Sequence, residues 1–273
     1  MNISVFYENL HEGARAAGLE IEEILQKLGN AGMDSIYLTA DSWKRDRDIL
    51  RESLKKLNLR VGGMHAFCDF PSDPETLRYR EIIDLAVESG ADNLLLIPGM
   101  LTTGNTCRDI DHMLEGMKRA TEYGRSVEMP VLMEDFDGLL SPYNCIAGLK
   151  WFLDSVEGLG CAFDTGNFVA FHEDELAAFE MFADRIQTVH LKDRSLMPQH
   201  EGNTPFVCAD GEKVYACSIG DGFIRIPDIL QKLQNRNYHG NLIVELYACD
   251  PRWFMKDALD SLCWLQKQLR AFS

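Results

Sequence analysis

Residues 131–135 read Val-Leu-Met-Glu-Asp, three apolar residues followed at once by two carboxylates. Three further stretches share this design, a short apolar run that ends in one metal-capable side chain: Cys-Ala-Phe-Asp (161–164), Thr-Val-His (188–190) and Leu-Ile-Val-Glu (242–245). The end residues are therefore Glu134, Asp164, His190 and Glu245, at intervals of 30, 26 and 55 residues. A strand, a crossover helix and their loops take roughly 30 residues. The first two intervals each match one such unit, and the third matches one unit plus an insertion.

Working outward from these four stretches, short β-rich runs alternate with longer helical patterns along the whole chain. The predicted strands are Ile3–Tyr7, Ser35–Thr39, Arg60–Ala66, Asn93–Ile97, Val131–Asp135, Cys161–Asp164, Ile186–Lys192 and Leu242–Leu246. The predicted helices are Ile21–Gly29, Trp43–Leu57, Pro74–Ser89, Arg108–Val127, Tyr143–Val156, Asp174–Ala183, Pro227–Asn235 and Arg252–Leu269.

Eight strands separated by helices imply parallel neighbours joined by right-handed crossovers. In 273 residues this pattern predicts a single α/β domain over residues 1–273, a closed (β/α)₈ TIM barrel. An open doubly wound sheet with a nucleotide site is the alternative. It is disfavoured because neither GxGxxG nor GxxxxGK[ST] follows the first strand.

The connection after the seventh predicted strand, from Lys192 to Ile226, is much longer than the usual loop of about 2–6 residues. Within it, residues 206–209 and 213–216 flank Asp210-Gly211, a pattern typical of a β-hairpin. Long loops on the catalytic face of a barrel often close over the site. We therefore expect this inserted loop and hairpin to act as a lid; a surface decoration is the alternative.

Composition and charge restrict the classes of partner. Apolar residues make up 46% and charged residues 26% of the chain, as in soluble globular proteins. The 27 Lys and Arg against 43 Asp and Glu give a net charge of −16. This charge disfavours nucleic acid or an anionic membrane as the main partner. A local basic pocket for a phosphate stays compatible with it.

Three sequence features bear on localisation. The first residues, MNISVFYENLHEG, lack a basic stretch followed by an apolar core, so no signal peptide is expected. No apolar run approaches the roughly 20 residues that span a bilayer. The eight cysteines are scattered without a CxxC pair. We expect a reduced, cytoplasmic protein, and a homo-oligomer is left open.

The four strand-end residues predict a metal site. Burying three carboxylates at one rim without a cation would combine lost solvation with like-charge repulsion. Oxygen ligands with one imidazole suit Mn²⁺, Mg²⁺ or Zn²⁺. Each residue also has a purely structural explanation: Asp164 could cap a turn, Glu134 could pair with a lysine, and His190 could be a satisfied core histidine. Their joint placement at four strand ends favours the metal.

With VLMED, FDTGN, VHLKD and IVELY as landmarks, the chain resembles the xylose isomerase-like TIM-barrel superfamily, in its branch of sugar phosphate isomerases and epimerases. That branch includes ketose 3-epimerases, hydroxypyruvate isomerase and inosose dehydratase, and endonuclease IV is a more distant relative. The resemblance implies a small carbohydrate substrate. It also implies that Glu134, Asp164, His190 and Glu245 hold the metal and that the two glutamates are the catalytic acid/base pair.

The chain also departs from the ketose 3-epimerases. Asn167 stands where they carry a substrate-contacting histidine, and Arg194 is the nearest candidate for their arginine, at a different spacing. Candidate substrate-binding residues are His65, Asn167, Lys192 and Arg252. Their structural alternatives are core packing for His65, a salt bridge for Lys192 and a helix cap for Arg252. Glu8, Tyr37 and Trp43 are candidate pocket walls.

These observations predict a metal-dependent isomerase or epimerase of a small polyhydroxy carbonyl compound. The metal would acidify the C–H bond beside the carbonyl and stabilise an enediolate, and Glu134 and Glu245 would move the proton. A dehydratase of the inosose type is the nearest alternative. A phosphodiesterase of the endonuclease IV type and a sugar-binding barrel without catalysis are further ones.

Overall fold

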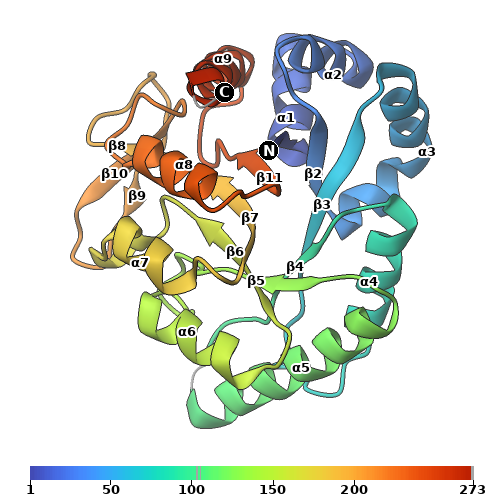
Figure 1. The fold of residues 1–273 in the computed structure, drawn as a ribbon, viewed down its shortest axis with the longest axis vertical. Coiled ribbons are helices and arrows are strands. Elements are labelled where there is room, and N and C mark those ends of the chain that lie inside the picture. The colour runs from blue at the N-terminus through green and yellow to red at the C-terminus, as the bar shows by residue number, and fades with distance from the viewer. Residues whose placement is uncertain (103, 105, 272–273) are drawn as a thin grey trace.

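The computed structural model describes residues 1–102, 104 and 106–271. A ring of parallel strands closes in the order β1-β11-β7-β6-β5-β4-β3-β2 (Figure 1). These strands are β1 (Asn2–Phe6), β2 (Ser35–Thr39), β3 (Arg60–Phe67), β4 (Leu94–Ile97), β5 (Val131–Met133), β6 (Gly160–Asp164), β7 (Ile186–Leu191) and β11 (Asn241–Val244). The first and last strands pair directly, with Asn2 opposite Asn241. The predicted (β/α)₈ barrel is confirmed.

Helices surround the ring of strands (Figure 1). They are α1 (Tyr7–Ala17), α2 (Ile21–Asn30), α3 (Ala40–Leu57), α4 (Arg78–Ser89), α5 (Thr106–Ser126), α6 (Ile146–Ser155), α7 (Glu175–Phe182), α8 (Ile226–Asn235) and α9 (Phe254–Ala271), with a 3₁₀ turn η1 (Phe168–Phe171).

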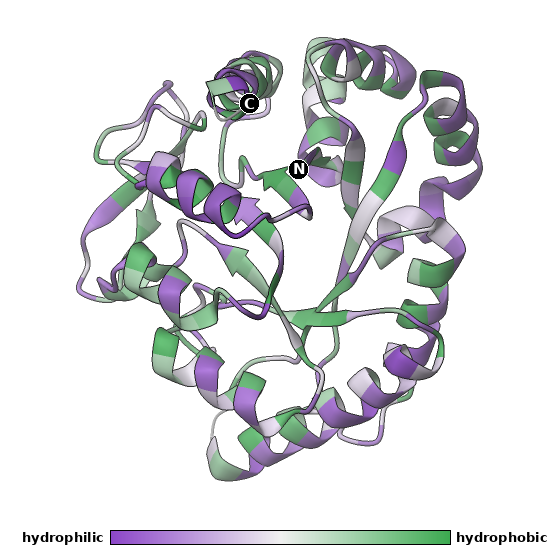
Figure 2. Cartoon of the chain, viewed as in Figure 1, coloured by the Kyte–Doolittle hydropathy of each residue, from purple (hydrophilic) through white to green (hydrophobic). Residues whose placement is uncertain are grey.

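Hydrophobic periodicity explains why these segments adopt their elements. On α2, Ile24, Leu25 and Leu28 are buried at helical spacing while Gln26 and Lys27 face outward. The strand β4, Leu-Leu-Leu-Ile, is buried on both faces, as expected for a parallel strand covered by helices. Figure 2 shows the result as hydrophobic strands inside and hydrophilic outer faces on the helices.

One helix was not predicted. The chain enters α1 directly after β1, where we expected a loop before the helix at residue 21. Its buried stripe is Tyr7, Leu10, Gly13 and Ala14, so two of its four inward positions are small residues. Gly13 is required because an added Cβ would lie 2.2 Å from the ring of Phe254 on α9. A stripe of small residues gives a weak periodic signal, which explains the error.

Two helices begin at least three residues later than predicted. The helix expected from Pro74 begins at Arg78, because Asp69 and Asp73 hold the preceding residues in turns: Asp69 Oδ1 accepts from the Ser72 N–H, and the Asp73 carbonyl accepts from the Thr76 N–H. The helix expected from Tyr143 begins after Cys145, whose sulfur accepts from the Gly148 N–H.

The long connection after β7 forms a three-stranded antiparallel sheet in the order β8-β10-β9. Its strands are β8 (Asp193–Ser195), β9 (Phe206–Val207) and β10 (Lys213–Cys217). The predicted hairpin is confirmed, with Val207 opposite Lys213 and Gly211 at φ +93° in the turn. The sheet is tied to η1 through the Ala209 N–H and the Ala170 carbonyl. It is tied to α9 through His200 and Asp257, 2.7 Å apart.

Two findings bear on the expected environment. The eight cysteines are free thiols. In the part of the chain that the structure describes, no helix combines the length and apolar character needed to cross a membrane.

The packing of α5 against Phe70 generates a stability prediction. An added Cβ at Gly116 would lie 2.3 Å from the ring of the fully buried Phe70. Gly116→Ala should therefore lower the free energy of unfolding by about 1–3 kcal/mol, because the ring has no room to move. Chemical denaturation monitored by circular dichroism measures the change.

Gly29 on α2 is the matched control, because an added Cβ there would only reach ordinary contact with Leu59 at 3.5 Å. Gly29→Ala should leave stability unchanged or raise it by up to about 1 kcal/mol. Equal effects of the two substitutions would contradict the packing described for Gly116.

Candidate metal centre

Four neighbouring strands bring the predicted ligands to one end of the barrel. Glu134 follows β5, Asp164 ends β6, His190 lies near the end of β7, and Glu245 follows β11. Asp164 and His190 are register partners across β6 and β7. The Glu245 N–H continues the ladder by donating to the Leu191 carbonyl at 3.0 Å. Parallel pairing therefore stacks the four side chains at the carboxyl ends of the strands, as the sequence predicted.

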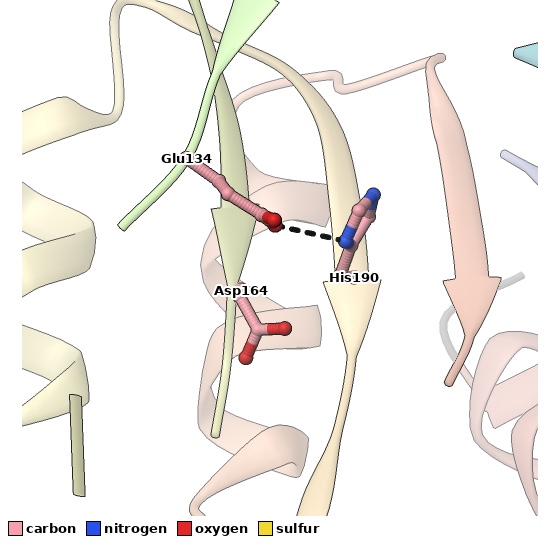
Figure 3. A group of neighbouring side chains, drawn as sticks. All are labelled: Glu134, Asp164 and His190. Carbon is pink, nitrogen blue, oxygen red and sulfur yellow. Dashed lines mark ion pairs between the residues drawn. The ribbon is translucent and has the colours of Figure 1, made fainter. Parts of the chain in front are cut away.

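The imidazole of His190 is at the centre of this group. Its Nδ1 atom lies 3.1 Å from Glu134 Oε2 and 3.3 Å from Glu245 Oε2. Ligand atoms of Glu134, Asp164 and His190 all lie within 4.8 Å of one another. Figure 3 shows the Glu134 carboxylate directed at the His190 ring, with Asp164 beside them. The side chains of Glu134, Asp164 and His190 are 9%, 0% and 1% exposed, so water cannot solvate them fully.

The ligand atoms are close to one another without satisfying one another. Glu134 Oε2, Asp164 Oδ2 and both ring nitrogens of His190 are buried and lack a hydrogen-bond partner. Buried polar atoms normally have such partners, and each one without them carries a desolvation penalty of about 1–3 kcal/mol. A divalent cation would accept lone pairs from the two carboxylates and from one ring nitrogen of His190. The residues present therefore fit a metal with oxygen and imidazole ligands.

A buried lysine already supplies part of the positive charge. Lys192 Nζ lies 2.6 Å from Glu245 Oε1 and 3.1 Å from Asp164 Oδ2. It also donates to Asn167 Oδ1 at 2.7 Å. Asn167 in turn donates through Nδ2 to the Asp135 carbonyl at 2.7 Å. Lys192 and Asn167, both predicted to contact substrate, thus form a polar pair beside the metal ligands.

The pKa values of these groups reflect burial and mutual charge. Burial raises the pKa of Asp164 to about 7, although Lys192 opposes the shift. Burial disfavours the charged form of His190, but Glu134 and Glu245 outweigh it and raise its pKa to about 10. Burial likewise opposes ionisation of Glu245, and its pKa is nonetheless held well below the usual range by Lys192 and His190. Additional positive charge at this site would therefore stabilise the ionised carboxylates.

Three of the four candidate ligands, Glu134, His190 and Glu245, line a pocket of about 560 Å³. His65 lines it, as predicted, with its ring stacked on Tyr37 at 5.5 Å and an interplanar angle of 4°. Gly63 makes this stack feasible, because a Cβ there would lie 2.4 Å from the Tyr37 ring. Of the candidate wall residues, Glu8 lines the pocket, whereas Tyr37 and Trp43 are buried away from it.

The structure does not bring Arg252 to the pocket. Its side chain is 69% exposed, and its guanidinium pairs with Asp250 at 2.5 Å. The Asp250 carboxylate also accepts from the Arg252 N–H, so the pair forms a turn before α9. The prediction that Arg252 binds substrate therefore has no geometric basis, and local capping explains this residue.

Sequence reasoning missed the residues that follow Glu134. Phe136 and Asp137 line the pocket. Asp135 is fully buried with neither carboxylate oxygen hydrogen-bonded, and burial beside Asp164 raises its pKa well above the usual range. Their position directly after a predicted catalytic strand end was the available signal, since loops at this face of a barrel carry function.

The expectation that the insertion after β7 covers the site is wrong for this pocket. Residues 195–218 contribute nothing to its lining, which comes instead from α1, from the strands of the barrel and from the loops after β5, β6 and β11. The inserted sheet lies outside the ring of strands (Figure 1). Its own contacts with η1 and α9 hold it beside the barrel.

Comparisons with known proteins agree with this architecture. Residues 22–268 match the family described as xylose isomerase-like TIM barrel. An inosose dehydratase of Lacticaseibacillus casei is 25% identical over 138 residues, covering 50% of this chain and 46% of that protein. The chain thus matches only about half the length of that curated relative.

Two solved structures show the fold across the whole chain. The probable 3-DHS dehydratase AsbF of Bacillus anthracis superposes with a TM-score of 0.73 at 16% identity, covering 97% of this chain and 99% of that one. A D-tagatose 3-epimerase-like protein gives a TM-score of 0.73 at 16% identity, covering 100% and 98%.

The unsatisfied ligand atoms generate a prediction on metal content. The purified protein should hold about one divalent ion per chain, and Asp164→Asn and His190→Ala should each lose most of it. Inductively coupled plasma mass spectrometry measures the metal. Asp210→Asn is the matched control, since Asp210 belongs to an exposed His172, Asp210 and Glu212 group that also has metal-ligand spacing. Metal that disappears in Asp210→Asn and persists in Asp164→Asn would refute the assignment.

The buried lysine generates a second prediction. With a chelator present, Lys192→Met should lower the free energy of unfolding by about 3 kcal/mol, because it leaves buried carboxylates uncompensated. Adding Mn²⁺ should shrink the difference from the unmodified protein. Lys150→Met, which removes an exposed pair with Asp154, should change stability by less than about 1 kcal/mol in either condition. A loss in Lys192→Met that Mn²⁺ does not reduce would contradict a shared electrostatic role.

Proposed function

Because the chain belongs to the xylose isomerase-like TIM barrel family, we propose that it is a metal-dependent isomerase or epimerase of a small polyhydroxy carbonyl compound. The observation that carries the proposal is the convergence of Glu134 and Glu245 on the Nδ1 atom of His190, at 3.1 Å and 3.3 Å. They come from strands separated by β6 and β7 in the barrel. Two carboxylates that face one pocket from different sides can serve opposite faces of one substrate carbon.

Glu134, Asp164, His190 and Glu245 are the residues that would hold the metal. When bound, a divalent cation supplies Lewis acidity toward a carbonyl oxygen. The nearby Lys192 and Asn167 are placed to orient substrate oxygens, because both line the pocket next to the ligands. His65 and Glu8 add further polar groups to the lining of the same pocket.

The proton transfer can be assigned to the glutamates. One carboxylate removes the proton from the carbon beside the carbonyl, and the electron pair of that C–H bond moves into an enediolate. In an epimerase the other, protonated, returns a proton to the same carbon from the opposite face. In an isomerase the proton is returned to the neighbouring carbon, and the hydroxyl proton moves from one enediolate oxygen to the other, so that the carbonyl and hydroxyl groups exchange places. General acid/base groups in such roles contribute about 10²–10⁴-fold to the rate. The walls of the pocket limit the access of water to the enediolate.

Dehydration is the second candidate, favoured by the match to an inosose dehydratase. There the electron pair would expel the hydroxyl on the next carbon, with a glutamic acid donating the proton that completes water. Phosphodiester cleavage of the endonuclease type fits less well, because the chain has a net charge of −16 and the described pocket lining holds five carboxylates against one lysine.

The reaction class is tested in deuterium oxide. The metal-loaded enzyme is incubated with ketoses and inososes, and the products are examined by mass spectrometry. An epimerase or isomerase that exchanges its proton with solvent should add one deuteron to the carbon-bound positions, whereas a dehydratase product should lose one water. Product that forms without solvent deuterium would rule out this exchanging glutamate pair.

Glu134→Gln and Glu245→Gln should each lower kcat by at least about 10²-fold, because the amide cannot accept the proton. Both are assayed with metal in excess. Glu12→Gln is the matched control, since Glu12 is a pocket carboxylate outside the ligand group. A kcat within about threefold of the unmodified enzyme in Glu134→Gln would remove Glu134 from the mechanism.

A further inference from the structure

The charged groups that line the pocket are almost all negative. Five carboxylates line it, and Lys192 is the one lysine or arginine among the described lining residues. The carboxylates belong to Glu8, Glu12, Glu134, Asp137 and Glu245. A divalent ion would offset two of these negative charges. The carboxylate of Asp164, which is buried next to the lining, adds one more negative charge. A substrate that brings two further negative charges would meet net repulsion at this mouth.

The ammonium of Lys192 is already paired with groups of the protein. It donates a hydrogen bond to Asn167 Oδ1 at 2.7 Å and forms ion pairs with Glu245 Oε1 at 2.6 Å and Asp164 Oδ2 at 3.1 Å. A phosphate that recruited Lys192 would have to take it from two buried carboxylates.

The arginines nearest to the pocket are also occupied. Arg194 is 1% exposed and does not line the pocket. Its Nη2 atom pairs with Asp137 at 3.3 Å, and its guanidinium lies 5.0 Å from the centre of the Phe206 ring. Arg252 is held outside the pocket by Asp250. Arg194 Nε is buried without a hydrogen-bond partner, but neither Arg194 nor Arg252 lines the pocket, so neither guanidinium meets a ligand there.

Several backbone N–H groups on this face already donate hydrogen bonds to carboxylates of the protein itself. Barrels often bind phosphate with the loops after their seventh and eighth strands. Here Asp193, just after β7, accepts from the N–H groups of Gly220 at 2.9 Å, Gly222 at 3.0 Å and Arg194 at 2.8 Å. Asp164 likewise accepts from the Gly166 and Asn167 N–H groups. The donors that would form an anion-binding nest therefore already bind an anion.

We infer that the substrate of this pocket is an uncharged polyhydroxy carbonyl compound and that its phosphate esters are rejected. The inference rests on the proposed function and names its substrate class. The apolar parts of the wall suit such a ligand, because the aromatic side chains of Phe6, Phe67, Phe136 and Tyr247 line the pocket and can pack against the C–H groups of a sugar. The volume of about 560 Å³ is in the range of small-molecule sites.

The test compares matched pairs of compounds, each a free ketose or inosose and its phosphate ester, with the metal-loaded enzyme. We expect kcat/KM for the free compound to exceed that for the ester by about 100-fold, from repulsion of two charges in a shielded pocket. An ester used as well as, or better than, its free parent would overturn the inference while leaving the proposed reaction intact.

A charge reversal at the mouth sharpens the comparison. Glu12 lies on α1, lines the pocket and is exposed. Glu12→Lys should raise the ratio of kcat/KM for the ester to kcat/KM for the free compound by about tenfold, because it replaces a repulsive charge at the mouth by an attractive one. Glu115→Lys makes the same change of net charge on an exposed position of α5 outside the pocket, and it should leave both values unchanged. Equal effects of the two reversals would contradict a local electrostatic barrier.

A binding measurement tests the inference without turnover. If no pair reacts, the proposed function fails, and calorimetry of inorganic phosphate with the metal-free protein still decides the substrate class. The absence of binding up to about 10 mM supports the inference. A Kd below about 1 mM that Lys192→Met abolishes would overturn it, because it would show an anion site in the pocket.

Discussion

The meeting of buried carboxylates at one rim of the barrel is the constraint on which the site depends. Glu134, Asp164 and Glu245 converge within reach of a single imidazole, and Asp135 is buried next to them. Taking each carboxylate out of water is costly, and their mutual repulsion adds to that cost. Positive charge must therefore be supplied from within the site. Lys192 supplies one unit, and the unsatisfied ligand atoms of Glu134, Asp164 and His190 indicate that more is required.

The geometry of the barrel brings these carboxylates together. Parallel strands place their carboxyl ends on one face, and closure through β1 and β11 brings β11 beside β7. Other donors near the pocket are also paired with carboxylates of the protein. Asp193 accepts a hydrogen bond from the Gly220 N–H, Asp137 pairs with Arg194, and Asp250 pairs with Arg252. A pocket whose cations are all internally paired is suited to neutral hydroxyl and carbonyl groups and to the chemistry of a C–H bond.

The strand ends could be predicted from the sequence because their signal is local. A short apolar run followed by Glu134, Asp164, His190 or Glu245 contains both the strand and its functional residue. Helix α1 could not be predicted in the same way, since its stripe includes Gly13, which is small only because Phe254 from the far end of the chain packs on it. The position of the insertion after β7 relative to the barrel could not be predicted from the sequence either. Its contacts with Ala170 and Asp257 join segments distant in sequence, and no pattern within residues 195–218 encodes them.

Anomalous diffraction from crystals grown with Mn²⁺ would test the metal assignment most directly. We expect one strong peak at about 2.0–2.3 Å from oxygens of Glu134, Asp164 and Glu245 and from a ring nitrogen of His190. Lys192 Nζ should then be withdrawn from Glu245 or Asp164 relative to its present contacts at 2.6 Å and 3.1 Å. A peak confined to His172, Asp210 and Glu212, with Lys192 still bridging the two carboxylates, would contradict a metal centre at the barrel rim.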